Sequence, residues 1–344
     1  MGPDPAVAAC RVAVRRALPV TSADDGGFGR PQVRGQGCVL VACSGGADSL
    51  ALLAAAIFEA HKASMRVIGA VVDHGLQEGS AAHTGRVVEQ MARLGADETA
   101  SIRVAVDPGP SGIEAGARAA RYAAFGRLAV HFDADVVLLG HTLDDQAETV
   151  LLGLTHGSGP RSLQGMRDLF DQDGVAFVRP FLQISRRQTE QACRAQGVSW
   201  WEDPHNSDPR FVRSRIRHTV MPMLERELGP GIAETLARTA GLIRADVQAL
   251  DSMAEASLGA AQDGAGGLDT SVLETYQDAI RTRVIRLAAI RAGAIAGELT
   301  REHIYAVADI ARRAQDHRRI QLPGHLTAYR VGTSLRFGPT GVES

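Results

Sequence analysis

The chain has few cysteines: its 344 residues include four, and no two of them form a Cys-x-x-Cys pair. This scarcity argues against a disulfide framework and against a zinc ribbon, so we expect a cytoplasmic location. Long apolar runs are also missing, because none approaches the roughly 20 residues that cross a bilayer. No uninterrupted apolar segment follows the Arg15-Arg16 pair, so we expect no signal peptide and no membrane partner.

Lysine is almost absent, since Lys62 is the only one in the chain. A Walker-type phosphate loop needs a lysine directly after its Gly-x4-Gly pair, and Lys62 stands in no such setting, which excludes that class of nucleotide site. The formal net charge is −2, so any role in binding nucleic acid must rest on local clusters of arginine. We attribute the high total of arginine to genomic base composition and keep phosphate binding for the clusters.

The length favours two domains, and the pattern of elements changes near residue 225. Strand-like and helix-like segments alternate over 38–200, with later strands expected at 101–106 and 177–181. This alternation predicts an α/β fold with a parallel, Rossmann-like sheet and helices on both of its faces. Helical patterns dominate 231–319, where helices are expected at 232–258, 271–293 and 301–315. A hairpin at 319–330 is expected to close the chain. The expected divisions are an N-terminal helix and loop at 1–37, a catalytic domain at 38–224 and a smaller, mainly helical domain at 225–344.

The most informative stretch joins a β-like run, Val39 to Cys43, to an Ala- and Leu-rich helical run that starts at Leu50. Two glycines between them permit a tight turn and a close approach of a ligand's oxygens. The unpaired N–H groups at the start of the helix add a partial positive charge, which predicts a phosphate site. The alternative is an ordinary turn with Asp48 or Ser49 as N-cap. The residues expected to bind phosphate are Ser44, Gly45, Gly46, Ala47, Asp48 and Ser49.

A second strand is expected to end near this loop. The apolar run from Arg66 to Val72 leads into Asp73-His74. Because ligands lie beyond the carboxyl ends of parallel strands, these two side chains are placed where a nucleotide's ribose or base could be. Taken alone, His74 is more typical of an ordinary loop residue.

A stripe of one histidine and three carboxylates follows the strand expected at 135–140: His141, Asp144, Asp145 and Glu148 share one face of the next helix. Carboxylates beside a polyphosphate suit Mg²⁺, which takes one or two of them together with phosphate oxygens. The alternative is that these carboxylates merely complement the dipole of the helix.

Arginines gather in two places that bear on function. Arg121 shares one face of the helix expected at 111–131 with Glu114 and Arg118, although a solvated stripe of ion pairs explains that spacing equally well. Arg213, Arg215 and Arg217 follow a pair of tryptophans and form the best candidate patch for a nucleic acid. The alternative, which has equal weight, is a linker helix whose arginines pair with Glu202, Asp203 and Asp208.

Short motifs with polar side chains run through the first two thirds of the chain. They are Ser44 to Ser49, Asp73-His74-Gly75-Leu76, Gly112-Ile113-Glu114-Ala115 with Arg118 and Arg121-Tyr122, His141-x-x-Asp144-Asp145-Gln146-x-Glu148-Thr149, Gly157-Ser158-Gly159, Arg179-Pro180 and Glu202-Asp203-x-x-Asn206. The first of them resembles the pyrophosphate-binding loop of the ATP pyrophosphatase (PP-loop) superfamily. In order and spacing, the set resembles the tRNA(Ile)-lysidine synthetase family in its shorter form.

This resemblance implies a ligase. ATP adenylates the C2 oxygen of the wobble cytidine in a tRNA(Ile) with a CAU anticodon, and free L-lysine then displaces AMP to give lysidine. The resemblance also implies that the phosphate loop binds ATP, that Arg121 and His141 act near the phosphates and the base, and that Asp145 orients the lysine amine or, with Asp48, holds Mg²⁺. A homodimer is a candidate assembly.

Three other functions remain as alternatives. A tRNA thiolase of the same superfamily would need paired cysteines or a cysteine-bound cluster, whereas Cys193 stands alone and Cys38 and Cys43 flank or lie in a strand. A small-molecule amide ligase would leave the arginine clusters unexplained. A non-catalytic nucleotide- or RNA-binding module would not need the intact set Asp48, Arg121, His141 and Asp145.

Overall fold

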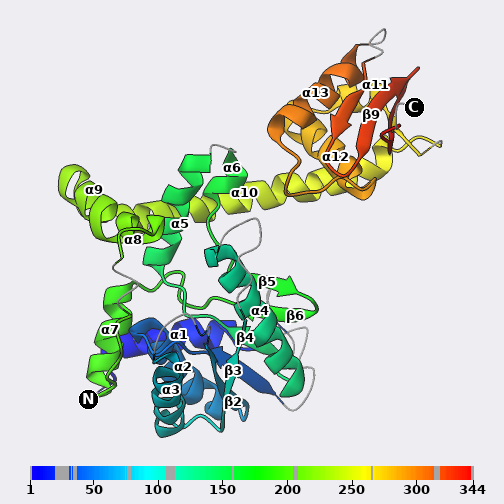
Figure 1. Cartoon of the computed structure of the whole chain (residues 1–344). Coiled ribbons are helices and arrows are strands. Elements are labelled where there is room, and N and C mark those ends of the chain that lie inside the picture. The colour runs from blue at the N-terminus through cyan, green and yellow to red at the C-terminus, as the bar shows by residue number, and fades with distance from the viewer. Residues whose placement is uncertain are drawn as a thin grey trace. The chain divides into compact units, whose positions relative to one another are not determined.

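The computed structural model describes residues 2–19, 31, 33, 37–73, 75, 79–105, 113–156, 159–203, 208–264, 266–313 and 318–341. They fall into two compact units, one of 1–156 with 163–240 and one of 157–162 with 241–344 (Figure 1). None of the described helices is both long and apolar enough to cross a bilayer.

The first unit is built on a six-stranded sheet, which confirms the predicted α/β class. In sheet order the strands are β3 (Glu98–Arg103), β2 (Arg66–Asp73), β1 (Cys38–Ala42), β4 (Val136–Leu138), β6 (Val175–Val178) and β5 (Leu169–Gln172). Neighbouring strands are parallel, except that β5 runs antiparallel to β6 at one edge. The strands predicted at 101–106 and 177–181 are β3 and β6, which lie two to three residues earlier than expected.

Helices cover both faces of this sheet, as predicted. One face is covered by α1 (Pro5–Ala17), α2 (Ala47–Lys62), α3 (Ser80–Leu94) and α7 (Arg186–Ala195), and the other by α4 (Ile113–His131). In β1, Val39 and Val41 belong to the first core, whereas Leu40 packs with Tyr122 and Phe125 in the second. The strand is a continuous apolar run because it is buried on both faces.

Two adjacent strands turn into helices at the carboxyl edge of the sheet. β1 leads through 43–46 into α2, and β4 leads through 139–142 into α5 (Leu143–His156). Gly140 lies where these turns meet, because a Cβ there would come within 3.2 Å of the Cα of Ser49. Glycine thus lets the end of β4 pack closely against the start of α2.

Short helices complete the first unit: α8 (Val212–Arg215), η2 (Ile216–Val220), α9 (Met221–Leu228) and the start of α10 (Ile232–Ala261). The η2 segment is a turn of π-helix that contacts α5. Such turns are rare and occur frequently at functional sites.

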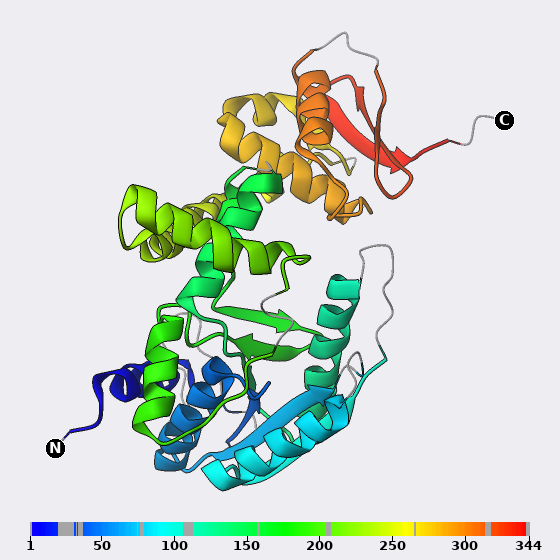
Figure 2. The same ribbon diagram turned by 60° about the vertical axis from the view of Figure 1, so that its left-hand side comes forward.

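The second unit joins helices to a small antiparallel sheet (Figure 2). Its elements are α6 (Pro160–Leu163), the rest of α10, β7 (Leu268–Asp269), α11 (Thr270–Thr275), α12 (Asp278–Arg291), α13 (Arg301–Arg312), β8 (Ile320–Leu322), β9 (Leu326–Val331) and β10 (Ser334–Pro339). The predicted hairpin is β8 and β9, and β10 and β7 extend it to four strands. The single helix predicted at 271–293 is wrong, because Tyr276 and Gln277 are extended and separate α11 from α12.

Candidate active site

The loop between β1 and α2 has a fixed backbone. Gly45 has a φ of +84°, and a Cβ there would come within 2.7 Å of a methyl carbon of Val87, so this position requires glycine. The loop is tied to its surroundings on two sides. The backbone N–H of Trp201 donates to the carbonyl of Gly45 at 3.0 Å, and Nε2 of His83 lies 3.1 Å from the carbonyl oxygen of Ser44.

The start of α2 is open to a ligand. Gly46 is the N-cap, and in the described part of the chain no side chain caps this end, so the alternative of Asp48 or Ser49 as N-cap is wrong. Ser49 closes the loop instead, because its hydroxyl accepts from the N–H of Ser44 at 3.1 Å and donates to the carbonyl of Gly46 at 3.0 Å. The free N–H groups of the first turn therefore remain for an anion.

A cavity of about 700 Å³ opens beside this loop. Its lining brings together most of the side chains singled out from the sequence: Ser44, Gly46, Asp48, Ser49, Asp73, Arg121 and His141, with Tyr122 and Trp201. Gly45 belongs to the same loop, and Ala47 is the first residue of α2. Asp145 lies in an adjoining acidic cluster, in which Asp145 and Glu148 pair with Arg186 and Arg217. His74 lies outside the described residues. The volume falls within the range of small-molecule and cofactor sites.

Asp73 is held at the end of β2. One carboxylate oxygen accepts from the backbone N–H of Gly75 at 2.8 Å, and the other accepts from Nε of Arg103 at 3.0 Å. Burial would raise the pKa of Asp73, but these hydrogen bonds outweigh it and hold the pKa below its ordinary value. The carboxylate is therefore ionised at the rim of the cavity.

His141 precedes α5 and is neutral. Burial, together with the nearby positive charge of Arg179, lowers the pKa of His141 to about 3. Its Nδ1 is buried and has no hydrogen-bond partner among the described residues. Arg179 is fixed by a hydrogen bond of 3.1 Å from Nη2 to the hydroxyl of Tyr122. The neutral imidazole lines the cavity, where it can form a hydrogen bond to a ligand without adding a charge.

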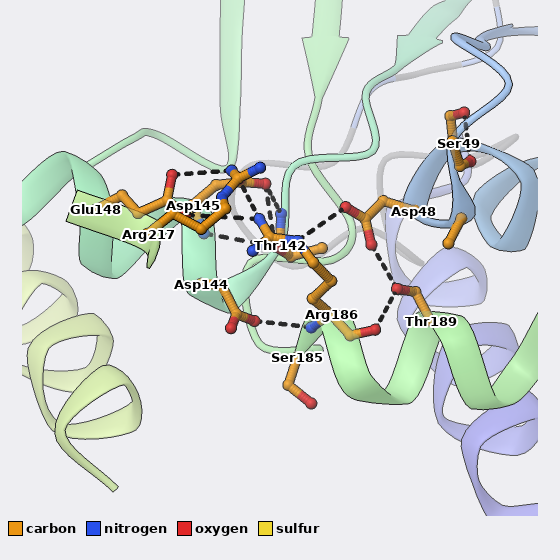
Figure 3. Close-up of polar contacts among 12 residues, drawn as sticks. Asp48, Ser49, Thr142, Asp144, Asp145, Glu148, Ser185, Arg186, Thr189 and Arg217 are labelled. Atoms are coloured by element: carbon orange, nitrogen blue, oxygen red, sulfur yellow. Dashed lines mark hydrogen bonds and ion pairs between the residues drawn. The ribbon is translucent and has the colours of Figure 1, made fainter. Parts of the chain in front are cut away.

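Asp145 accepts hydrogen bonds on both carboxylate oxygens (Figure 3). Oδ2 accepts from the backbone N–H of Thr142 at 2.8 Å and from its hydroxyl at 3.0 Å, which closes the first turn of α5. Oδ1 accepts from Arg186 at 2.9 Å and from Arg217 at 3.0 Å. The charge of Arg186 outweighs burial and holds the pKa of Asp145 below its ordinary value.

The side chain of Arg217 points into this acidic cluster. Its guanidinium grips Glu148 with two hydrogen bonds, of 2.7 and 3.0 Å, and also reaches Asp145 (Figure 3). Arg215 instead donates to the carbonyls of Pro209 and Arg210. The alternative prediction paired arginines 213, 215 and 217 with Glu202, Asp203 and Asp208. The structure instead pairs Arg217 with Glu148 and Asp145.

Asp48 links the cavity to the acidic cluster. Its Oδ1 is hydrogen-bonded to the hydroxyl of Thr189, and its Oδ2 lies 3.6 Å from Nε of Arg186. Burial raises the pKa of Asp48 to about 6 against the opposing charge of Arg186. The spacing of residues did not reveal this link, because Arg186 and Thr189 come from α7, about 140 residues along the chain.

The side chains around the cavity could hold a metal ion only if a bound phosphate supplied further oxygen ligands. Among the described residues no three His, Cys, Asp or Glu side chains form a group that could hold one. Mg²⁺ needs one or two carboxylates when phosphates supply further oxygens. Asp48 meets that need from within the cavity, whereas Asp145 would first have to exchange an arginine contact for the ion.

Known sequences match this chain over most of its length. The family model of the PP-loop domain matches residues 23–224. The tRNA(Ile)-lysidine synthase of Streptomyces coelicolor is 45% identical, over 97% of this chain and 99% of its own length. That of Thermobifida fusca is 46% identical over 94% of both. That of Mycolicibacterium paratuberculosis is 50% identical over 74% of this chain and 75% of its own.

A solved structure shares the fold. The U34-tRNA thiolase NcsA from Methanococcus maripaludis, solved with its 4Fe-4S cluster, superposes with a TM-score of 0.53 over 70% of this chain and 80% of that one. The two sequences are 17% identical. This likeness bears on the α/β architecture alone.

Proposed function

The chain belongs to the PP-loop family and, within it, to the tRNA(Ile)-lysidine synthases, and we propose that it is an ATP-dependent ligase that joins lysine to the wobble cytidine of a tRNA(Ile). The observation that carries this proposal is the near-complete alignment with such synthases, together with a cavity that is lined by the PP-loop and by Arg121 and His141.

The reaction has two steps. In the first, the C2 oxygen of the cytidine attacks the α-phosphate of ATP, and pyrophosphate leaves. In the second, an amine of free L-lysine attacks C2, loses a proton and expels AMP with the former C2 oxygen. A cytosine carbonyl is a poor electrophile, and adenylation turns its oxygen into a good leaving group. Holding both substrates close together in the reactive orientation supplies much of the remaining rate acceleration.

ATP binding is assigned to the loop Ser44–Ser49 and the end of β2. The open N-terminus of α2 offers N–H groups and a positive dipole end to the phosphates. Asp73, ionised at the rim of the cavity, suits the ribose hydroxyls or the base. His74 keeps the same proposed role from the sequence.

The chemical roles are assigned by charge. Arg121 offers its permanent positive charge to the phosphates, and the neutral imidazole of His141 can hydrogen-bond to the base or its adenylated oxygen. In the adjoining cluster, the carboxylates of Asp48, Asp145 and Glu148 pair with only two guanidiniums, so carboxylates are in excess and leave a net negative charge. That charge suits the ammonium of lysine, which Asp145 would orient. Asp48 and Asp145 are the proposed carboxylates for Mg²⁺, which when bound neutralises polyphosphate charge.

The tRNA contact remains assigned to Arg213, Arg215 and Arg217, and the helical domain at 225–344 is proposed to extend it beyond the catalytic domain at 38–224. For Arg217 the ion pairs with Glu148 add a role in the acidic cluster. We also propose that the protein is cytoplasmic and that it forms a homodimer.

A single-turnover assay with omissions tests this function. AMP should appear only when ATP, tRNA(Ile) with a CAU anticodon and L-lysine are all present, while pyrophosphate should appear without lysine. A thiolase would instead need a sulfur donor, and a binding module would release neither product. The described part of the chain gives a thiolase little support, because all four cysteines are buried thiols. Release of AMP that is indifferent to lysine would overturn the proposal.

A further inference from the structure

One helix that belongs to neither the PP-loop nor the acidic cluster reaches both of them. The guanidinium of Arg186, in the first turn of α7, has Nη2 at 2.9 Å from Oδ1 of Asp145 and at 3.7 Å from Oε1 of Glu148. Its Nε lies 3.6 Å from Oδ2 of Asp48. The backbone N–H of the same residue donates to Asp144 at 2.7 Å (Figure 3). Arg186 thus contacts α2 and α5 at the same time.

The position of Arg186 is set by the helix that carries it. Ser185 and Gln188 form a capping box that fixes where α7 begins. Further along, Ala192 and Cys193 are buried in the core that α2 shares. One turn after Arg186, the hydroxyl of Thr189 is hydrogen-bonded to Asp48. Because α7 is anchored at both ends of this stretch, the guanidinium has a defined place between the two acidic helices.

The geometry of this contact suits arginine better than lysine. Carboxylates brought together from α2 and α5 repel one another, and a positive charge between them removes that repulsion. A guanidinium has a rigid fork of donors that can serve two carboxylates at once, whereas an ammonium is a point charge on a flexible stem. Only 23% of the Arg186 side chain is exposed, so water screens these contacts weakly.

We propose that Arg186 is a positioning residue of the ligase reaction, which holds Asp48 of the ATP cavity and Asp145 of the acidic cluster at a fixed separation. This inference rests on the proposed function. Asp48 faces the phosphate site and Asp145 faces the proposed lysine site, so the bridge keeps the adenylated base and the attacking amine in register. A displacement of about 1 Å in such an arrangement can cost on the order of a hundredfold in rate.

The test compares three variants in the full-length protein. Arg186→Gln removes the charge, Arg186→Lys keeps the charge and loses the fork, and Arg187→Gln changes the exposed neighbouring arginine as a control. We measure melting temperature, kcat, and KM for ATP and for lysine. Arg186→Lys should melt near the wild type and yet lose at least tenfold in kcat, and Arg186→Gln should lose about a hundredfold. The control should match the wild type.

Each result decides the question. A folded Arg186→Lys or Arg186→Gln protein with the kcat of the control would overturn the proposal, because the bridge would then be an ordinary ion pair. Loss of folding in both variants would make Arg186 a structural residue and would also overturn it. If the wild type and the control release no AMP with tRNA and lysine, the proposed function itself fails, which is a distinct outcome.

Discussion

Replacing Asp145 by asparagine tests the acidic cluster at its most connected member. The carboxylate accepts two hydrogen bonds from Thr142 on one oxygen and two from guanidiniums on the other. Asparagine has the same size but one acceptor oxygen. Whichever way it turns, its NH₂ group faces donors, so at least two of these hydrogen bonds are lost.

The expected magnitudes differ for stability and for activity. Removing one partner of a buried ion pair costs about 3–5 kcal/mol, but Arg186 and Arg217 both keep a contact to Glu148, so we expect a smaller loss of about 1–3 kcal/mol in the free energy of unfolding. Lysidine formation should fall by about two orders of magnitude or more, the scale of a positioned catalytic group. ATP affinity should persist, because Asp145 does not line the cavity and Asp48, which does, remains to hold Mg²⁺.

Three measurements on the same Asp145→Asn protein check this reasoning: thermal unfolding, calorimetry with ATP, and single-turnover formation of AMP from tRNA and lysine. Activity within a few fold of the wild type would mean that the stripe serves only the dipole of α5. Loss of ATP binding in a folded variant would mean that Asp145 belongs to the nucleotide site.

Three further predictions concern the loop, the base site and the tRNA. A Cβ at Gly46 would meet Ser44 at 3.6 Å, an ordinary contact, so Gly46→Val should fold and lose ATP binding, and normal affinity by calorimetry would refute the role of the loop. The pKa of His141, lowered to about 3 by burial and by Arg179, means that its imidazole should stay neutral from pH 5 to 8 in NMR spectra, and a titration near pH 6.5 would contradict this. Replacing Arg213 and Arg215 by alanine should lower the salt slope of tRNA binding by about one unit or slightly less per lost contact, and an unchanged slope would argue that neither touches phosphate.

The buried elements were predictable because their patterns are local. β1 and α2 follow from an apolar run and from an Ala- and Leu-rich run, and the intervening glycines mark the loop. The edge strand β5 was missed because it is half exposed and has no apolar run. The break between α11 and α12 was missed because Tyr276-Gln277 contains neither proline nor glycine.

The contacts of the acidic cluster could not be read from spacing. Arg213, Arg215 and Arg217 are spaced two residues apart, which predicts a single basic patch. Arg217, however, lies in the π-helical turn η2, and its side chain binds Glu148 on α5. No sequence pattern pointed to Arg186, because its partners Asp145 and Asp48 lie 41 and about 140 residues away in the sequence. Such links depend on how the helices pack, which no single segment of the sequence encodes.

The mass of the anticodon nucleotide after reaction tests the central claim most directly. The protein is incubated with ATP, L-lysine and tRNA(Ile) carrying a CAU anticodon, and the digested tRNA is analysed by mass spectrometry. The wobble cytidine should gain one lysine and lose one water, in an amount equal to the AMP released. An unchanged cytidine while AMP accumulates, or a gain of sulfur in place of oxygen, would contradict the assignment of this chain as a lysine ligase.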